Sequence, residues 1–273
     1  MCSKAAYPNS PLDQSASTTP ELTSTRVTLF ISDLHLDPSR PAITRAFLDF
    51  LKGEACNADA LYILGDFFEA WVGDDDDSPL IATISQALKI LNDSGTVCYL
   101  MHGNRDFLIG EQFCQRSGCT LLQDPCTIDL YGKPVLLMHG DSLCTGDEGY
   151  MAFRAQARSP QWQQQILAMP IDDRRALAKQ LRESSMDANS NKAEDIMDVT
   201  SSEVVKEMEL AGVDLLIHGH THRPAIHQHR SDDLNHGSEN LKRVVLGDWH
   251  NTGWLLRYNN NGDYALEEFA IEP

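Results

Sequence analysis

Five short polar clusters carry the residue types that bind transition-metal ions, and each cluster follows closely on a run of apolar residues. Together they supply two carboxylates, one amide and four imidazoles as candidate ligands: Asp33, His35, Asp66, Asn104, His139, His220 and His222. A mixed oxygen and nitrogen set without thiolates suits Mn²⁺, Fe²⁺ or Zn²⁺ better than Ca²⁺ or a soft metal. The clusters therefore predict a site for divalent transition metals.

The candidate ligands are numerous enough for two ions. A single histidine after an apolar strand is more often structural than a ligand, but five such clusters in one chain favour a shared centre. Two divalent cations held about 3.5 to 4 Å apart repel each other unless an anionic group lies between them. We expect Asp66 to be the carboxylate that bridges the pair.

The runs that precede the clusters have the length and composition of buried β-strands. They are rich in Val, Ile and Leu, and they cover Val27–Ile31, Ala60–Leu64, Val97–Met101, Val135–Met138 and Val213–Ile217. Glycine permits the sharp turn that ends such a strand, and open α/β sheets place their ligands at the carboxyl ends of strands. We therefore expect the clusters to meet at one sheet edge.

Helical segments alternate with these strands and predict a layered α/β domain. They cover Ile43–Lys52, Leu80–Asn92 and Gly110–Ser117, and further strands are expected at Arg243–Gly247, Gly253–Tyr258 and Tyr264–Ala270. Residues 153–211 read instead as a long helical tract, which we interpret as an inserted lid. In it, Thr200 and Glu203 have the spacing of a capping box, and Gly212 would end that helix.

Composition excludes several classes of protein. The chain has 273 residues, with 40 acidic against 22 basic side chains and a net charge of -18, which argues against a nucleic-acid binder. No stretch approaches the roughly 18 to 20 apolar residues of a spanning helix. Residues 1–25 are rich in Ser, Thr and Pro and predict a disordered leader. The seven cysteines include no CxxC pair, which favours reduced thiols in the cytoplasm.

The motif series from Val27 to about Trp254 resembles the calcineurin-like metallophosphoesterase superfamily. More closely, six strings resemble the family of hydrolases that act on UDP-2,3-diacylglucosamine in bacterial lipid A synthesis. They are DLHL (33–36), GDFFEAWVGDDD (65–76), GNRDFL (103–108), HGDSLCTGD (139–147), IMDV (196–199) and HGHTHRP (218–224). The resemblance implies a sandwich of two β-sheets flanked by helices over residues 26–273, with an inserted helical lid.

The same resemblance implies a role for each site residue. One Mn²⁺ would be bound by Asp33, His35, Asp66 and His222, and a second by Asp66, Asn104, His139 and His220. Catalytic roles would fall to Asp66, Asn104, Arg105 and His220, and substrate contacts to Asn104, Arg105, Asp147, Ser185, Asn189, Lys192 and His220. Metal hydroxide would attack the UMP phosphorus, giving UMP and 2,3-diacylglucosamine 1-phosphate. The family also implies a peripheral position on the cytoplasmic face of the inner membrane, without an obligate protein partner.

Arg105 occupies a place where many members of the broader superfamily carry a histidine that can protonate a leaving alkoxide. Arginine stays protonated at neutral pH, so it cannot act as a general acid, but its planar fork binds phosphate oxygens. A phosphate monoester leaves without needing a proton, because its second pKa is near 6. Arg105 therefore favours cleavage of a pyrophosphate bond, unless it is a surface ion-pair partner of Asp106.

Other features admit two interpretations each. The run Asp74–Asp77 is either a solvated acidic loop or a support for the site, and Asp141 and Asp248 either orient imidazoles or end strands. Apolar residues of the helical tract either pack together or form a lipid groove. Two other functions stay open: a metallophosphoesterase for a soluble nucleotide derivative or phosphodiester, and a non-catalytic scaffold, which would be expected to have lost ligands.

Overall fold

The computed structural model describes residues 26–190, 198–231 and 240–273. The first half of the chain alternates strands and helices: β1 (Val27–Ile31), α1 (Pro41–Gly53), β2 (Ala60–Leu64), α2 (Pro79–Asp93), β3 (Val97–Met101), α3 (Glu111–Ser117), β4 (Thr120–Leu122), β5 (Cys126–Leu130) and β6 (Lys133–Leu137). Helices α4 (Glu148–Ala157), α5 (Pro160–Leu167), α6 (Ile171–Ser190) and α7 (Ser201–Ala211) follow. The chain closes with β7 (Leu215–His218), β8 (Ala225–Arg230), β9 (Asn240–Val245), β10 (Thr252–Asn259) and β11 (Tyr264–Ala270).

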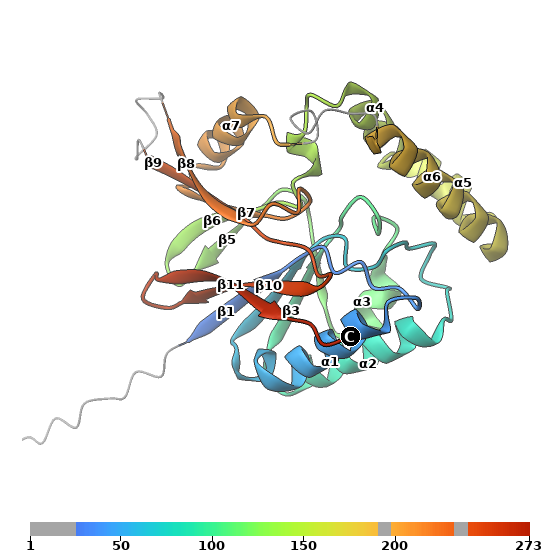
Figure 1. The fold of residues 1–273 in the computed structure, drawn as a ribbon, viewed down its shortest axis with the longest axis horizontal. Coiled ribbons are helices and arrows are strands. Elements are labelled where there is room, and N and C mark those ends of the chain that lie inside the picture. Colours follow the sequence, from blue (N-terminus) through green and yellow to red (C-terminus); the bar gives the residue numbers. More distant parts are fainter. Residues whose placement is uncertain (1–25, 191–197, 232–239) are drawn as a thin grey trace, which may run out of the picture.

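The described strands form two mixed sheets that pack against each other (Figure 1). The first has the order β11-β10-β1-β2-β3-β4, with β1 to β4 parallel and β10 and β11 antiparallel to their neighbours. The second has the order β5-β6-β7-β9-β8, with β6, β7 and β9 parallel. This confirms the predicted sandwich of two sheets flanked by helices.

The alternation of side chains along β1 shows how the layers are held together. Leu29 and Ile31 point into a core shared with the helices α1 to α3, whereas Phe30 points into the core between the two sheets. All three side chains are fully buried. A mainly apolar run is therefore required, because both faces of the first sheet are covered, and the one polar side chain of β1, Thr28, is buried with a hydrogen bond to the hydroxyl of Tyr131.

A third core lies on the outer face of the second sheet, where α7 contributes Val204 and Met208 and the strands contribute Leu136 and Leu216. The helix α7 thus packs on the sandwich, although it belongs to the tract expected to form a lid. The helices α4, α5 and α6 lie apart from it, beside the loops that follow the first sheet (Figure 1). We call these three helices, residues 148–190, the cap.

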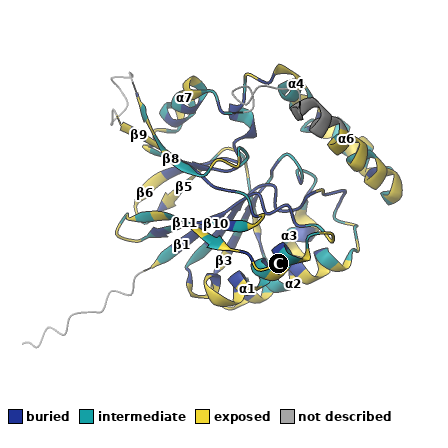
Figure 2. Cartoon of the chain, viewed as in Figure 1, coloured by how far each residue is buried: buried dark blue, intermediate teal, exposed yellow. Residues whose placement is uncertain are grey.

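Over residues 148–183, where burial is described, the cap is mainly exposed and few of its side chains are buried (Figure 2). Ion pairs attach α6 to the loop after β2. The Arg174 side chain is 4% exposed, donates to the carbonyl oxygen of Val72 at 2.7 Å and pairs with Asp75 at 2.5 Å. Arg175, whose side chain is more exposed than that of Arg174, pairs with Asp76 at 3.0 Å. Both carboxylates of the acidic run thus support the docking of the cap, although Asp75 is still largely exposed to solvent.

Replacing Arg174 with methionine is expected to loosen α6. Because Asp75 is largely exposed, the pair contributes about 1 kcal/mol, and amide exchange in α6 should accelerate about fivefold. The hydrogen bond from Arg174 lowers the pKa of Asp75 below 3.8. The stabilisation by the Arg174–Asp75 pair is therefore fully present above the ordinary aspartate pKa of 3.8. It is lost as the pH falls through the lower pKa that Asp75 has in the folded protein. Lys179→Met, which removes an exposed pair with Glu183 inside α6, is the control, and equal exchange rates in both variants would contradict this docking model.

Most expected elements match the structure, and one detail is wrong. The strands β1, β2, β3 and β11 begin and end where the sequence predicts, whereas β4, β5 and β8 were not predicted. Thr200 is the N-cap of α7, but its side chain does not cap the helix and instead accepts a hydrogen bond from Thr145 at 2.8 Å. Gly212 ends α7 in the left-handed region, as expected. None of the described helices is both long and apolar enough to cross a membrane.

Candidate metal centre

The seven predicted ligands converge, but on the adjoining ends of two sheets rather than on one sheet edge. The loops after β1, β2 and β3 of the first sheet carry Asp33, His35, Asp66 and Asn104, whereas those after β6 and β7 of the second carry His139, His220 and His222. The expectation of a single edge was wrong because an apolar run does not reveal which sheet its strand joins. Face-to-face packing of the sheets brings the two sets of loops together.

Unusual backbone conformations orient the side chains of the predicted ligands. Among the described residues other than glycine, positive φ angles occur at six positions, and five of them are predicted ligands: Asp33, His35, Asp66, His220 and His222. Such conformations are uncommon for residues other than glycine, although Asp and His adopt them more readily than most, and they concentrate at functional sites. The loop after β3 passes very close to the loop after β2, and only a glycine at position 103 allows this. A Cβ at Gly103 would lie 2.1 Å from the backbone nitrogen of Asp66. The loops are therefore shaped for the site.

One group of donors contains Asp33, His35 and His222. The Oδ1 atom of Asp33 lies 3.3 Å from Nε2 of His222 and 4.0 Å from Nε2 of His35. The two imidazole Nε2 atoms are 3.3 Å apart. Oδ1 of Asp33 is buried and has no hydrogen-bond partner. A divalent cation between these three atoms would satisfy that oxygen, so the residues fit a metal site.

A second group lies beside it, around the amide oxygen of Asn104. Nε2 of His139 and Nδ1 of His220 lie 3.0 and 2.9 Å from that oxygen. Nδ1 of His139 donates to the carbonyl oxygen of Leu64 at 2.9 Å, which leaves Nε2 free to bind a cation. The Asp141 carboxylate does not orient this ring, because it binds Tyr150 and Arg154 at 2.5 and 2.8 Å.

Asp66 lies between the two groups. Its Oδ2 atom is 3.8 Å from Nε2 of His35, and its Oδ1 atom is 3.7 Å from Nε2 of His139. One carboxylate thus faces a candidate ligand of each ion, which is the arrangement that a bridge requires. Asp33 also belongs to both potential metal-binding groups, since it clusters with Asp66 and His139 as well as with His35 and His222.

The buried carboxylates give the centre a negative potential. Burial alone would lower the pKa of His139, but the charges of Asp66 and Asp33 raise it to about 9. Burial is likewise outweighed at His222, whose pKa is raised to about 9 chiefly by the adjacent carboxylate of Asp33. For His220, burial prevails and lowers the pKa to about 4. A divalent cation would take the place of the protons that this potential attracts.

Glu69 is a site residue that the sequence did not reveal. It is buried, and its Oε2 atom lies 3.4 Å from Nδ1 of His35, on the ring edge opposite the metal-facing nitrogen. Its Oε1 atom lies 3.5 Å from Nη1 of Arg105 and 3.0 Å from Nε of Arg182 in the cap. Burial would raise the pKa of Glu69, but His35 and the two arginines lower it. The hint that the sequence offered for Glu69 was its position three residues after the predicted ligand Asp66.

Glu69→Gln is expected to lower the affinity of the centre for a divalent metal by about 10- to 100-fold, because carboxylates behind a ligating imidazole fix its orientation and basicity. Metal titration of the purified variant measures this effect. Glu54→Gln, which changes a surface partner of Arg257, is the control. Unchanged metal affinity in Glu69→Gln would show that His35 does not depend on this carboxylate.

Arg105 extends from the same loop as Asn104, and its backbone nitrogen donates to Oδ1 of Asp66 at 2.8 Å. Its partner is Glu69 rather than Asp106, whose carboxylate accepts backbone hydrogen bonds from Phe67 and Gly103. The Nε atom of Arg105 is buried without a hydrogen-bond partner. The surface-pair interpretation is therefore wrong, and the guanidinium retains capacity to bind an oxyanion.

The remaining predicted substrate residues belong to the cap or to the segment after it. The Asp147 carboxylate accepts a hydrogen bond from the backbone nitrogen of Tyr150 at 3.0 Å and caps α4. Ser185 and Asn189 lie on α6, and Lys192 falls outside the described residues, as does the expected leader at 1–25.

Two acidic side chains have support roles: Asp74 accepts hydrogen bonds from the backbone nitrogens of Gly110 and Phe113, and Asp248 lies 3.8 Å from Nδ1 of His222.

Comparison with known proteins agrees with this geometry. Residues 27–224 match the family model of calcineurin-like phosphoesterases. The chain is 59% identical to a UDP-2,3-diacylglucosamine hydrolase from Cellvibrio japonicus, over 89% of this chain and 99% of that protein. Proteins of the same name from Marinobacter nauticus and Chromohalobacter salexigens are 57% and 55% identical, over 88% and 90% of this chain and 96% and 98% of theirs. The chain belongs to the calcineurin-like phosphoesterase family and groups with its UDP-2,3-diacylglucosamine hydrolase members.

Proposed function

We propose that this protein hydrolyses the pyrophosphate bond of UDP-2,3-diacylglucosamine to UMP and 2,3-diacylglucosamine 1-phosphate, a step of lipid A synthesis. The observation that carries the proposal is the convergence of all seven donors in a chain so similar to proteins named for this substrate. A scaffold would not need the complete set of donors. A soluble nucleotide or a phosphodiester as substrate has no comparable support among these relatives.

We assign two Mn²⁺ ions to the centre, one to each group of donors, with Asp66 shared between them. The ligand chemistry is equally compatible with Fe²⁺ or Zn²⁺, and metal availability decides among them. When bound, the pair would acidify a water molecule and offset negative charge on the phosphoryl group. Asp33, His35 and His222 hold one side of the site, and Asn104, His139 and His220 hold the other.

The chain supplies phosphate recognition through Arg105. Its unpartnered Nε atom and its fork can bind the oxygens of the attacked phosphoryl group, while Glu69 pairs with Nη1 of the guanidinium. The residue cannot donate a proton, and the departing sugar phosphate does not need one, because its second pKa is near 6. Water attack at the UMP phosphorus is therefore consistent with the side chains around the centre.

The cap provides apolar and polar surface for the rest of the substrate. Three half-buried aromatic rings lie near the loop that carries Arg105: Trp162 of α5 is 6.0 Å from Phe107 and 6.5 Å from Phe153, measured between ring centroids. Burial of acyl chain against such rings contributes about 0.8 kcal/mol per CH₂ group. We assign the acyl chains to this cluster, and the polar contacts to Asp147, Ser185, Asn189 and Lys192.

Hydrolysis of UDP-2,3-diacylglucosamine with added Mn²⁺ in ¹⁸O water tests the proposed reaction. The proposal requires rapid, metal-dependent cleavage with the label in UMP. Label in the sugar phosphate alone would mean attack on the other phosphorus. Hydrolysis of soluble phosphodiesters with no action on the lipid nucleotide would contradict the proposed substrate.

We further propose that the protein works at the cytoplasmic face of the inner membrane, where its acylated substrate would be found. Its net charge of -18 gives no general attraction to anionic headgroups, so attachment should be apolar and depend weakly on salt. Flotation with lipid vesicles measures this, and release by moderate salt would contradict an apolar attachment.

A further inference from the structure

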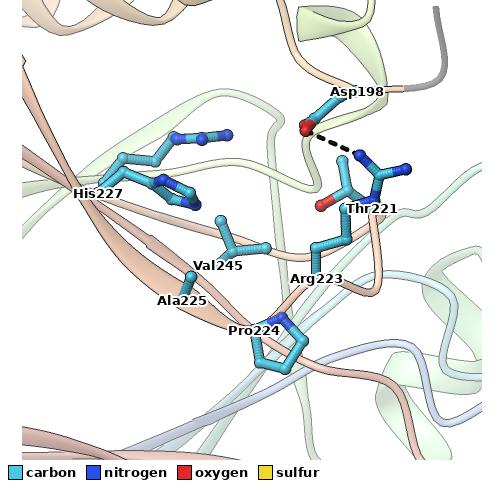
Figure 3. A pocket seen from close by; sticks show the side chains of 8 residues that line it. Asp198, Thr221, Arg223, Pro224, Ala225, His227 and Val245 are labelled. Atoms are coloured by element: carbon cyan, nitrogen blue, oxygen red, sulfur yellow. Dashed lines mark hydrogen bonds and ion pairs between the residues drawn. The ribbon is translucent and has the colours of Figure 1, made fainter. Parts of the chain in front are cut away.

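A pocket of about 210 Å³ lies between β8, β9 and the loop that carries the last two predicted ligands (Figure 3). Arg243, His227, Thr221, Arg223 and Asp198 supply its polar lining. None of the seven predicted metal ligands lines it, so the pocket is separate from the centre described above. Its volume would hold several water molecules or one phosphate-sized ion.

Arg243 is the unusual feature of this pocket. The residue is only 5% exposed, yet the one hydrogen bond that its side chain makes with the described residues is a long contact of 3.5 Å from Nη1 to Nε2 of His218. Its Nε atom has no hydrogen-bond partner, and no carboxylate of the described residues forms an ion pair with it; burial lowers the pKa of the guanidinium, and the charge of Asp198 offsets only part of this. A guanidinium that is buried without a counter-ion is strongly destabilising, and proteins rarely keep one. This charge therefore calls for an anion.

The side chains next to Arg243 also favour binding of an anion in this pocket. His227 is the register partner of Arg243 across β8 and β9, so both side chains lie on one face of the sheet. The hydroxyl of Thr221 is buried and unpartnered. The one acidic group in the lining, Asp198, is already paired with Arg223 at 3.2 Å (Figure 3). Among the described side chains that line the pocket, two are arginines and one is a carboxylate, although the whole protein is strongly acidic.

We propose that this pocket is a second binding site for a phosphate-sized oxyanion, held by Arg243, Thr221 and His227. The ligand is either inorganic phosphate or the phosphoryl group of a small ester, since both present the tetrahedral oxygens that a guanidinium fork and a hydroxyl bind. Thr221 lies between His220 and His222, so the bound anion would also brace the loop that carries both histidines. The site does not depend on the proposed reaction.

Calorimetric titration of the metal-loaded protein with inorganic phosphate tests the site. We expect two classes of binding site, one at the metal centre and one in the pocket. Arg243→Met should weaken the pocket class at least tenfold and leave the metal-centre class intact. Asp66→Asn should weaken the metal-centre class and leave the pocket class intact. The matched control is Arg230→Met, which removes an arginine of β8 that does not line the pocket.

A second variant keeps the test decisive if Arg243→Met folds poorly. Thr221→Val removes the unpartnered hydroxyl at nearly constant shape and should also weaken the pocket class. Competition with UMP separates the two sources: displacement of phosphate from the pocket identifies an ester site, and failure to displace it identifies a site for the free ion. A single class of phosphate sites that vanishes in Asp66→Asn, or unchanged binding in both pocket variants, would overturn the proposal.

Discussion

Asp66→Asn should abolish turnover and remove bound metal together. The substitution keeps the size of the side chain but removes the negative charge that faces both His35 and His139. Two cations without a shared anion repel each other, so at least one ion should be lost. Because metal ions supply several kcal/mol of transition-state stabilisation, kcat should fall by at least about 10³-fold, or about 4 kcal/mol. Turnover and metal content per chain are measured on the same preparation.

Asp129→Asn is the matched control for this variant. Asp129 lies on the β5–β6 hairpin, is exposed and accepts a hydrogen bond from the backbone nitrogen of Gly132 at 2.9 Å. It should retain full metal content and normal turnover. An Asp66→Asn protein that keeps both ions would refute the bridge, and Asp33, which also belongs to both donor groups, would become the candidate.

Arg105→Met should lower kcat/KM by about 10² to 10³-fold, the range observed when one donor to a developing oxyanion is removed. Arg105→Lys should lose less, since it keeps the charge but not the planar fork. The ratio of wild-type to variant activity should be constant from neutral to mildly alkaline pH, because a guanidinium does not titrate there. A pH–rate profile of each variant with the lipid nucleotide provides the measurement.

Arg116→Met serves as the control for Arg105→Met, because it removes an exposed arginine that donates only to the backbone oxygen of Asp74. It should leave activity unchanged. A loss in Arg105→Met that grows or shrinks with pH in step with one ionisation would indicate proton transfer at this position. The leaving group would then need a proton, contrary to our account of the pyrophosphate bond.

Sequence patterns located the strands that hold the centre because these strands are buried on both faces. The runs at β1, β2 and β3 are almost entirely apolar, with Thr28 of β1 as the exception, so their length and ends are visible in the sequence. β8 was not visible, since its residues alternate between half-buried and exposed and include two histidines and an arginine. β4, with three residues, is too short to show a period.

The partners within the site were harder to predict than its ligands. Ligand positions follow from one rule, that polar residues at the ends of parallel strands gather, and this rule holds for each sheet. The division of donors between two sheets depends on strand pairing, which local sequence does not encode. The contacts of Glu69 with Arg182, and of Asp75 with Arg174, join the loop after β2 to a helix about one hundred residues away. Only the folded chain reveals them.

Anomalous diffraction from crystals of the protein loaded with Mn²⁺ tests the central claim most directly. Our account predicts two anomalous peaks about 3.5 to 4 Å apart, separated by the carboxylate of Asp66, the first beside His35 and His222 and the second beside His139 and Asn104. A single peak, or two peaks without Asp66 between them, would contradict it.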